Sequence, residues 1–236
     1  MMKVLDSGID NAQDIMLEDE RLLESLNKDS DVILHFYEWR KKSATYGLLI
    51  DPKDYLNIKE AENQNLSLAK RPTGGGIIFH IWDFAFSLLV PSSSKYFSCN
   101  HLENYKFVND VVLKCIKYFL DKSLVTLHED SVSFKNDVAN KFCMAKATKY
   151  DVLCNKKKFA GAAQRKKKNG FLHQGSIFIA KPNGNYLKKI IKDESVLKAI
   201  LENTGYLIDN DDENEMFKIK EILKKLLVKE FQKIVE

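Results

Sequence analysis

The chain has 236 residues, of which 44% are hydrophobic and 30% are charged, so its composition is that of a globular protein. Its 37 Lys and Arg residues against 33 Asp and Glu give a formal net charge of +4, which is too small to indicate a nucleic-acid-binding protein. No apolar run approaches the ~18 residues of a membrane span, and no signal peptide or paired-cysteine motif is visible, so we expect a reduced, cytoplasmic protein that uses neither a membrane nor nucleic acid.

The first half of the chain predicts one helix followed by strands. Apolar residues between positions 11 and 26 recur at helical spacing, which is typical of an amphipathic helix. Residues 32–39 alternate two rows of apolar and aromatic side chains, as a strand does. After three glycines, the runs 77–79 and 84–90 are rich in aromatic and β-branched residues, so we expect them to be paired strands.

The second half predicts a helix, a block of strands and a helical end. An apolar stripe with charged residues on its opposite side predicts a helix over 106–119. Short apolar runs separated by turn residues predict three strands, at 150–154, 158–163 and 175–180. Residues 181–236 predict further helices. Strands and helices are mixed without strict alternation, so we expect an α+β or a loosely mixed α/β fold, with α+β preferred, in which residues 1–236 form one domain.

The first candidate for a binding site is the triple glycine Gly74 to Gly76, which follows Arg71 and Thr73. Three glycines allow backbone N–H groups to turn toward an anion, and an arginine guanidinium suits a phosphate or a carboxylate. The same glycines could instead form a tight hairpin. The segment matches neither a Walker loop nor a G-x-G-x-x-G fingerprint, which disfavours a P-loop or hydride-transfer enzyme.

The second candidate is Lys158, which comes two residues before Ala160 in a run of small side chains. In a regular strand these two residues share a face, and small residues there would let a ligand lie against the strand. Lys158 is either a solvated lysine or a cation that polarises a carbonyl group. The basic clusters at 156–158 and 165–168 are either a solvated hairpin tip or a binding surface for an acidic partner or a phosphate-bearing ligand.

Two further candidates are Cys143 and His173. Cys143 has Lys141 and Lys146 as neighbours in the sequence, and Lys158 follows one hairpin later. If one of these ammonium groups lies close to the sulfur, it would favour the reactive thiolate. His173 precedes a predicted strand, where a histidine is either structural or part of a site. The sequence alone does not choose between these alternatives.

Four segments, taken in this order, resemble the lipoate–protein ligase A and octanoyltransferase family, which is related to biotin protein ligases. They are the aromatic strand 35–39 with Gly47, the segment 70–76 with His80, the segment from Tyr150-Asp151 through the strand 158–165, and the segment 173–176. The resemblance runs from about Ile9 to Ala180 and implies a central mixed or antiparallel sheet flanked by helices. Because residues 181–236 are left as a helical C-terminal part, we expect no separate accessory domain.

The resemblance also implies roles for individual residues. The loop from Arg71 to Gly76 would wrap the acyl chain and an activated phosphate, and Lys158 would hold the acyl carbonyl oxygen. The catalytic residues would be Lys158 and Cys143, and no metal ligand is implied. The residues implied in acyl or adenylate binding are Arg71, Thr73, Gly74, Gly75, Gly76, His80, Gly161, Ala162, Ala163, Gln164, His173 and Gly175.

Family members attach lipoate or octanoate to one lysine of lipoyl carrier domains, so the implied partners are E2 subunits of 2-oxoacid dehydrogenases or the glycine cleavage H protein. The triple glycine is similar to that of ligases that form an acyl-adenylate from ATP with Mg²⁺. The spacing of Cys143 from the strand of Lys158 is similar instead to enzymes that carry the acyl group as a thioester and take it from a donor such as acyl carrier protein. Asp83 stands three residues after His80, where many ligases have an aspartate directly after the histidine. A non-catalytic lipoyl-protein binder is the third alternative.

Overall fold

The computed structural model describes residues 1–129 and 138–235, and these residues form a seven-stranded and a three-stranded sheet. The larger sheet has the order β1-β2-β6-β10-β9-β8-β7, and the smaller has the order β4-β3-β5. The strands are β1 (Met2–Asp10), β2 (Val32–Trp39), β3 (Ser43–Tyr46), β4 (Ser67–Lys70), β5 (Ile77–His80), β6 (Asp83–Pro91), β7 (Val125–Leu127), β8 (Val152–Cys154), β9 (Lys157–Lys167) and β10 (Gly170–Phe178). The helices are α1 (Ala12–Ser25), α2 (Ile58–Asn63), α3 (His101–Ile116), α4 (Gly184–Ile190), α5 (Glu194–Asn203) and α6 (Glu213–Val235), with 3-10 turns at Pro52–Asp54 and Ala139–Lys141.

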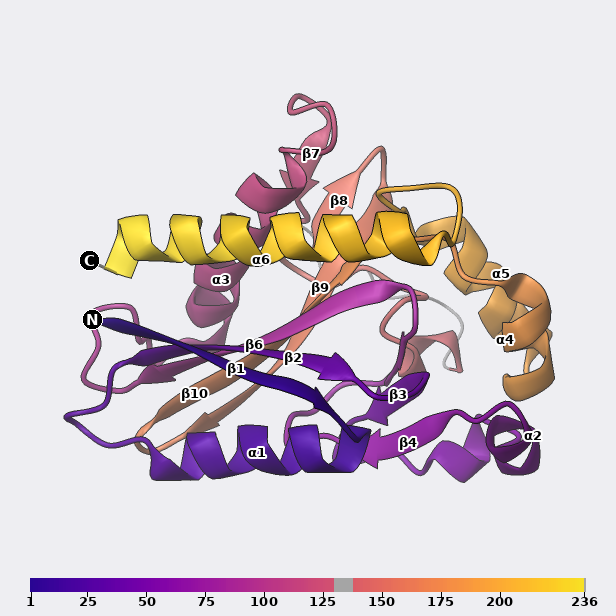
Figure 1. Ribbon diagram of the computed structural model, residues 1–236, viewed down its shortest axis with the longest axis horizontal. Coiled ribbons are helices and arrows are strands. Elements are labelled where there is room, and N and C mark those ends of the chain that lie inside the picture. Colours follow the sequence, from indigo (N-terminus) through magenta and orange to yellow (C-terminus); the bar gives the residue numbers. More distant parts are fainter. Residues whose placement is uncertain (130–137, 236) are drawn as a thin grey trace.

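The larger sheet is mixed: β1 pairs with β2 in parallel, and all other neighbouring strands of this sheet pair in antiparallel fashion. Helices cover both of its faces: α6 crosses one side and α1 runs along the other (Figure 1). The expected α+β fold with a mixed central sheet and flanking helices is therefore confirmed.

The central strand β6 shows how the two faces are filled. Phe84 and Phe86 lie on the side of α3 and α6 and belong to the main hydrophobic core, whereas Ala85 packs against α1 with Met16 and Tyr37. Successive residues of a strand point to opposite faces, so both faces of β6 are buried. The α1 face also carries polar side chains, among them Ser87 and Gln174, which bond to Asp19 of α1. The functional site described below lies on that face.

The runs 77–79 and 84–90 were predicted to pair with each other, and this prediction is wrong. β5 pairs with β3 in the small sheet, while β6 pairs with β2 and β10 in the large one. The chain passes between the sheets at Trp82, whose carbonyl oxygen accepts hydrogen bonds from the backbone of Ile179 and Ala180. Both strands are apolar on both faces, so their pattern does not specify which partner each one takes.

The predicted helix at 11–26 is confirmed as α1, the strand at 32–39 as β2, and the helix at 106–119 as α3 with an earlier start. The three predicted strands of the second half correspond to β8, β9 and β10, and the C-terminal helices to α4, α5 and α6. The strands β1, β3, β4 and β7 were not predicted. β1 lies at the sheet edge with most of its residues exposed, so it lacks the alternation that predicts a strand.

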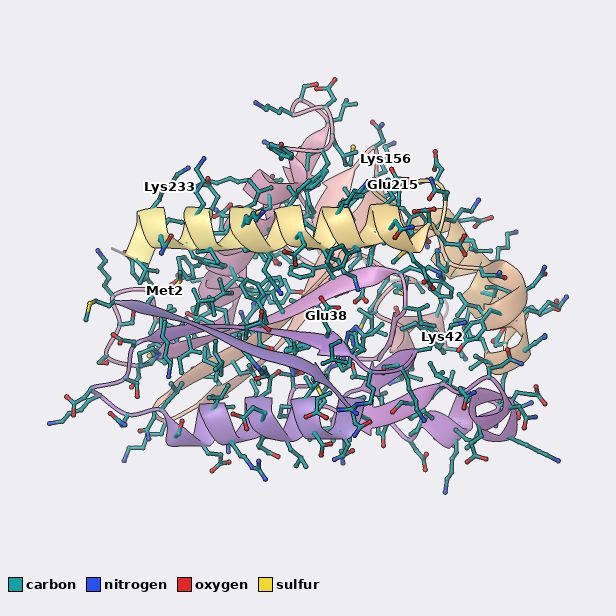
Figure 2. The ribbon with its side chains drawn as sticks, in the orientation of Figure 1. Met2, Glu38, Lys42, Lys156, Glu215 and Lys233 are labelled. Atoms are coloured by element: carbon teal, nitrogen blue, oxygen red, sulfur yellow. The ribbon has the colours of Figure 1, made fainter. Side chains whose placement is uncertain are left out.

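The basic cluster at 165–168 lies at the β9–β10 hairpin tip, and acidic residues of α1 neutralise part of it. Arg165 pairs with Glu20 at 3.2 Å, and Lys167 pairs with Glu24. Other charged side chains project into solvent around the molecule, among them Lys42, Lys156, Glu215 and Lys233 (Figure 2). In the part of the chain that the structure describes, no helix has the length and apolar character needed to cross a membrane.

Candidate active site

A narrow cavity, here called the inner cavity, lies on the α1 face of the large sheet. Its wall comes from β9 and β10 on one side and from β3 and β5 of the small sheet on the other. The residues lining it are Met16, Tyr37, Thr45, Arg71, Ile78, His80, Ala85, Cys143, Lys158, Gly161, Ala162, Ala163, Gln174, Gly175, Ser176 and Phe178. Most of its wall is apolar, which suits a hydrocarbon chain.

A second space of about 360 Å³, here called the outer cleft, adjoins the inner cavity. The triple glycine, Lys141, Lys146 and Thr148 line it, together with Leu49, Ile50 and Asn140. Cys143, Lys158 and Ala162 line both spaces. Cys143 and Lys158 therefore stand at the junction between the narrow apolar cavity and the larger cleft, which Lys141 and Lys146 also line.

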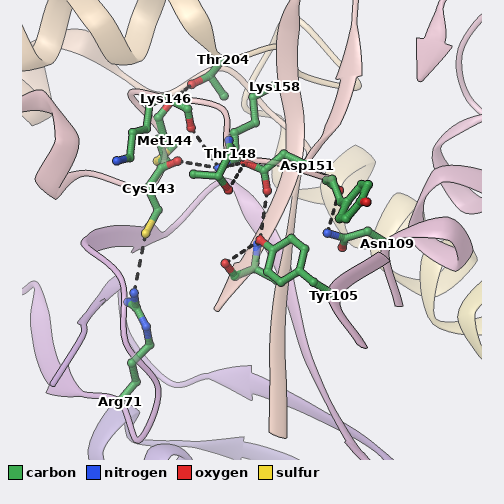
Figure 3. A network of polar contacts seen from close by, with 12 residues as sticks. Arg71, Tyr105, Asn109, Cys143, Met144, Lys146, Thr148, Asp151, Lys158 and Thr204 are labelled. Atoms are coloured by element: carbon green, nitrogen blue, oxygen red, sulfur yellow. Dashed lines mark hydrogen bonds and ion pairs between the residues drawn. The ribbon is translucent and has the colours of Figure 1, made fainter. Parts of the chain in front are cut away.

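The ammonium group of Lys158 is held by three acceptors (Figure 3). Its Nζ lies 2.8 Å from Oδ2 of Asp151 and donates hydrogen bonds to the backbone oxygens of Cys143, at 2.8 Å, and Lys146, at 3.1 Å. The Lys158 residue is 4% exposed, and Asp151 is fully buried. An ammonium group has three protons, so each proton already has an acceptor. A ligand oxygen that binds Nζ must replace one of these contacts, and the Lys146 oxygen is the most distant.

A β-bulge determines where Lys158 points. Leu153 pairs with Lys158 and Val152 pairs with Ala160, so Phe159 is an extra residue on β9. Because adjacent residues of β8 face opposite sides, their partners Lys158 and Ala160 also face opposite sides. The expectation that Lys158 and Ala160 share a face is therefore wrong. The bulge puts Lys158 on the cavity face instead.

Gly161 gives the Lys158 side chain its path across the sheet. A Cβ atom at position 161 would lie 2.4 Å from Cε and 2.5 Å from Nζ of Lys158. No side chain larger than hydrogen fits there without moving the ammonium group. Gly161 and Ala163 also line the inner cavity, as the run of small residues predicted.

Arg71 is the cation nearest to the Cys143 sulfur among the contacts that the structure shows. Its Nη2 lies 3.6 Å from Sγ and also donates to the carbonyl oxygens of Gly74 and Gly76, each at 2.8 Å. Its Nη1 donates to the carbonyl oxygen of Thr45 at 3.1 Å. Arg71 is 3% exposed, so this side chain braces the glycine loop from inside the protein.

The three glycines of the loop differ in their backbone conformation and in the space available for a side chain. Gly75 has a φ of +85°, and a Cβ there would lie 2.8 Å from Nη2 of Arg71 and 3.6 Å from Sγ of Cys143. A Cβ at Gly76 would lie 2.1 Å from the carbonyl oxygen of Lys141, whereas one at Gly74 would meet nothing within 4 Å. The N–H groups of these three glycines donate no hydrogen bond to a described residue, so they remain available to an anionic ligand.

His80 lines the inner cavity and belongs to a buried polar chain. Its Nδ1 lies 2.8 Å from Oδ2 of Asp83, and its Nε2 lies 2.9 Å from Oγ1 of Thr45. Ser176 donates to the same Asp83 oxygen at 2.6 Å, and the Trp39 ring stacks on the imidazole. Thr73, another predicted residue, donates to Oε1 of Gln174 at 2.7 Å and is fully buried.

His173 and Gln164 lie on the opposite face of the large sheet and do not line the inner cavity. Nδ1 of His173 contacts the Gln164 amide at 2.8 Å, and its ring packs near Phe86 and Tyr105. Burial lowers the pKa of His173 to about 3, so the imidazole is neutral. Gly175 lets the Phe86 ring pack against β10, since a Cβ there would lie 2.6 Å from that ring. His173 and Gln164 therefore support the sheet behind the cavity, whereas Gly175 also lines it.

Residues 11–236 match the family described as the lipoyl protein ligase A/B catalytic domain. The match covers nearly the whole chain. The chain belongs to this family. The resemblance carried by the four sequence motifs is thereby confirmed.

Two curated relatives are similar over most of the chain. Octanoyltransferase LipM of Bacillus subtilis is 24% identical over 184 residues, which cover 75% of this chain and 65% of that protein. Octanoyltransferase LipM of Staphylococcus epidermidis is 24% identical over 216 residues, which cover 84% of this chain and 77% of that protein. The chain thus spans about two thirds of the first relative's length and somewhat more of the second's.

Solved structures of the lipoyl protein ligase A/B family have the same fold. A lipoate protein ligase from T. acidophilum with bound lipoic acid superposes with a TM-score of 0.71 and 18% identity, covering 98% of this chain and 84% of that one. Lipoate-protein ligase A bound with ATP gives a TM-score of 0.72 and 20% identity, covering 98% and 83%. At these identities the likeness concerns the fold.

Sequence reasoning did not assign a role to three of the residues that organise this family member's site: Thr45, Tyr105 and Asp151. The Tyr105 hydroxyl contacts Oδ1 of Asp151 at 3.0 Å and both the amide and the carbonyl of Ala162. An acid and a lysine on either side of the short β8–β9 turn were a usable signal for the Asp151–Lys158 pair. Tyr105 and Thr45 come from distant elements, and the sequence carried no signal for them.

Proposed function

We propose that this protein transfers an octanoyl or lipoyl group to a lysine of a lipoyl carrier domain and carries it on Cys143 as a thioester. The observation that supports this most directly is the position of Cys143, which lines both the narrow apolar cavity and the outer cleft. Its sulfur contacts Arg71, and its backbone oxygen accepts a hydrogen bond from Lys158. Both acyl groups have an eight-carbon chain that the cavity would shield from water. The similarity to two octanoyltransferases supports the same reaction class.

The reaction would take place in two balanced steps. The Cys143 thiolate attacks the carbonyl carbon of an acyl thioester donor, a new S–C bond forms, and the donor sulfur leaves and takes up a proton. The amine of the carrier lysine then attacks the Cys143 thioester, loses a proton and forms an amide, while the Cys143 sulfur leaves as a thiolate. The donor and the carrier would both approach through the outer cleft. The acyl chain would remain in the inner cavity during both steps.

Lys158 would stabilise the oxygen of the acyl group as negative charge develops on it. For this purpose one of its three N–H donors must turn from a protein oxygen toward the ligand. The contact with the Lys146 oxygen is the longest at 3.1 Å, and Lys146 also lines the outer cleft. The bond to Asp151 would persist and keep the ammonium at the junction. Lys158 then binds the reacting atoms, while Asp151 positions it.

The proposed acyl transfer requires two protein partners. An acyl carrier protein would supply the thioester, and a lipoyl domain of a 2-oxoacid dehydrogenase E2 subunit or the glycine cleavage H protein would accept the acyl group. A structure in this fold class is described as a bipartite lipoate protein ligase together with its E2 lipoyl domain. A single catalytic domain over residues 1–236 and a cytoplasmic location remain predictions.

The decisive experiment compares wild type with Cys143→Ser in acyl transfer to a purified lipoyl domain. One arm supplies octanoyl acyl carrier protein without ATP, and the other supplies free lipoate with ATP and Mg²⁺. We expect activity in the first arm, an octanoyl mass adduct on Cys143, and loss of both in the serine variant. Full activity of Cys143→Ser would contradict the thioester mechanism.

Adenylation is the second candidate, and one observation favours it. Gly74 to Gly76, whose N–H groups have no hydrogen-bond partner among the described residues, line the outer cleft together with Lys141 and Lys146, which is a suitable environment for phosphate groups. In that case the second arm of the experiment would be active with both proteins, and the first would be inactive with both. Binding of the lipoyl domain without acylation in either arm would indicate a non-catalytic binder.

A further inference from the structure

Arg71 carries a charge that no carboxylate of the described residues neutralises directly. It is 3% exposed, and a guanidinium stays protonated at any physiological pH. Its oxygen partners are the hydroxyls of Thr45 and Thr73 and the backbone carbonyls of Thr45, Gly74 and Gly76. Among residues 1–129 and 138–235, no carboxylate forms an ion pair with it. A buried charge in this situation is unfavourable unless an anion lies nearby.

Two hydrogen-bonded chains connect Arg71 to buried carboxylates without bringing either of them into contact with it. One chain runs through Thr45 and His80 to Asp83. The other runs through Thr73 and Gln174 to Asp19, where the Gln174 amide donates to Oδ2 at 2.6 Å. These chains fix the orientation of the guanidinium. They leave its Nη2 side, which faces Cys143, without a negative partner.

The sulfur of Cys143 occupies that side. Nη2 lies 3.6 Å from Sγ, whereas the ammonium of Lys158 bonds to the backbone oxygen of the same residue (Figure 3). The two cations therefore approach Cys143 from different directions and contact different atoms. Gly75 keeps the space beside both Nη2 and Sγ open, since its missing Cβ would come close to each of them.

The other charged or titratable groups around Cys143 do not take the place of Arg71. Asp151 is bound to Lys158, Thr148 and Tyr105. Burial raises the pKa of Tyr105 well above its usual value, so this hydroxyl stays protonated. Lys141 and Lys146 belong to the same segment as Cys143 and line the outer cleft, and His80 is engaged by Asp83 and Thr45.

We infer that Arg71 is the counterion of the Cys143 thiolate and that Lys158 is reserved for the oxygen of the acyl group. The loss of the thiol proton to solvent gives Arg71 a direct negative partner, which the described residues do not otherwise supply. The role of Lys158 in this division rests on the proposed acyl transfer. The role of Arg71 does not, because a stabilised thiolate can be detected without any acyl substrate.

The test is the rate at which iodoacetamide alkylates each cysteine, followed by peptide mass spectrometry. A thiolate displaces iodide and forms an S–C bond, so the rate at a given pH reports the thiolate fraction. The chain contains its own references. Cys99 is exposed and remote from the site, whereas burial raises the pKa of Cys115 to about 12 and also raises that of Cys154. Alkylation of Cys115 or Cys154 at pH 7 would reveal unfolding in any variant.

We expect wild-type Cys143 to react faster than Cys99 at pH 7 and to keep this advantage as the pH is lowered to 6. In Arg71→Gln the Cys143 rate at pH 7 should fall by about fivefold to tenfold, because the smaller thiolate fraction is only partly offset by higher intrinsic nucleophilicity. Arg71→Lys should lie between the two. The double variant Lys158→Met with Asp151→Asn removes both charges of the buried ion pair. It should change the Cys143 rate by less than about twofold, since the pair has no net charge and its ammonium does not contact the sulfur.

The inference is overturned if the double variant Lys158→Met with Asp151→Asn slows Cys143 as much as Arg71→Gln does, or if Arg71→Gln leaves the rate within about twofold of wild type. If Arg71→Gln unfolds, as labelling of Cys115 would show, the inference is tested instead with Arg71→Lys and with the pH dependence of the wild-type Cys143 rate. A Cys143 rate that follows pH in the same way as Cys99 then contradicts the inference. Acylation of Cys143 is measured in a separate experiment. If the Cys143 thiolate depends on Arg71 but no acyl adduct forms on Cys143, the thioester mechanism is contradicted and the inference about Arg71 is supported.

Discussion

Asp151 and Lys158 form an ion pair that water hardly reaches. Oδ2 lies 2.8 Å from Nζ, and the exposed fractions of the two side chains are 0% and 5%. Further hydrogen bonds from Thr148 and Tyr105 satisfy the carboxylate, and two backbone oxygens satisfy the ammonium. The pair is stable because its polar atoms have partners. Removing one of the two charges lowers the stability of the protein, because the other charge stays buried without a counterion.

Lys158→Ala should therefore lower both stability and turnover. We expect a loss of about 3 kcal/mol in the free energy of unfolding, because Asp151 remains buried without a counterion. Turnover should fall by roughly a hundredfold, the scale of losing one preorganised donor. Denaturant titration and single-turnover acylation of a lipoyl domain measure the two effects.

The double variant Lys158→Met with Asp151→Asn separates stability from chemistry. It removes both charges, so most of the lost stability should return while turnover stays low. Near-normal carrier acylation by either variant would exclude Lys158 from the mechanism.

Tyr105→Phe tests whether the hydroxyl that links α3 to Asp151 and Ala162 supports the site. Removing it leaves the Ala162 amide and one Asp151 oxygen without this partner, so we expect a loss of about 1 to 2 kcal/mol in stability and a lower turnover. Tyr186→Phe is the matched control, because its hydroxyl is buried and has no hydrogen-bond partner in the described residues. The control should stay within about 0.5 kcal/mol of wild type. Equal effects of the two substitutions would argue against a specific role for Tyr105.

Gly75→Ala should abolish activity because the new side chain displaces Arg71, and not because of backbone strain alone. The new Cβ would lie 2.8 Å from Nη2 of Arg71 in a backbone with φ of +85°. Gly8 also has a positive φ, of +67°, but a Cβ there meets nothing within 4 Å and lies in the edge strand β1. Gly8→Ala should therefore share the backbone strain of about 1 kcal/mol and keep full activity. Thermal melts and acyl-transfer assays of both variants check this, and a similar loss of activity in Gly8→Ala would contradict it.

His173 should make the protein less stable as the pH falls. Burial lowers the pKa of His173 from 6.5 to about 3, so the unfolded chain takes up a proton in a range where the folded protein does not. Its contribution to stability is complete above pH 6.5 and declines as the pH falls toward 3, by about 1.4 kcal/mol per pH unit. Denaturant unfolding at pH 7.5, 6.5 and 5.5 should show a shallower pH dependence for His173→Gln than for wild type. The exposed His101, replaced by glutamine, serves as the control, and equal slopes in all three proteins would contradict the assignment.

The glycine loop, the cysteine and the lysine were identifiable before the fold was known, because each belongs to a local pattern. Arg71 and Gly75 lie within five residues of one another, and the run of small residues after Lys158 is continuous in the sequence. The structure brings Arg71, Cys143 and Lys158 to one junction. It does not bring His173 or Gln164 there, since alternate residues of β9 and β10 face opposite sides of the sheet.

The sequence by itself determined the family, the α+β class and the principal chemical groups, since motif spacing and side-chain periodicity are local properties of the chain. Only the tertiary structure decided which atoms meet. A one-residue bulge at Phe159 turned Lys158 away from Ala160, and strand pairing separated β5 from β6. The contacts that orient the site join residues far apart in the chain, such as Tyr105 to Asp151 and Arg71 to Cys143. Such contacts depend on register and packing between distant segments, which no local pattern of residues specifies.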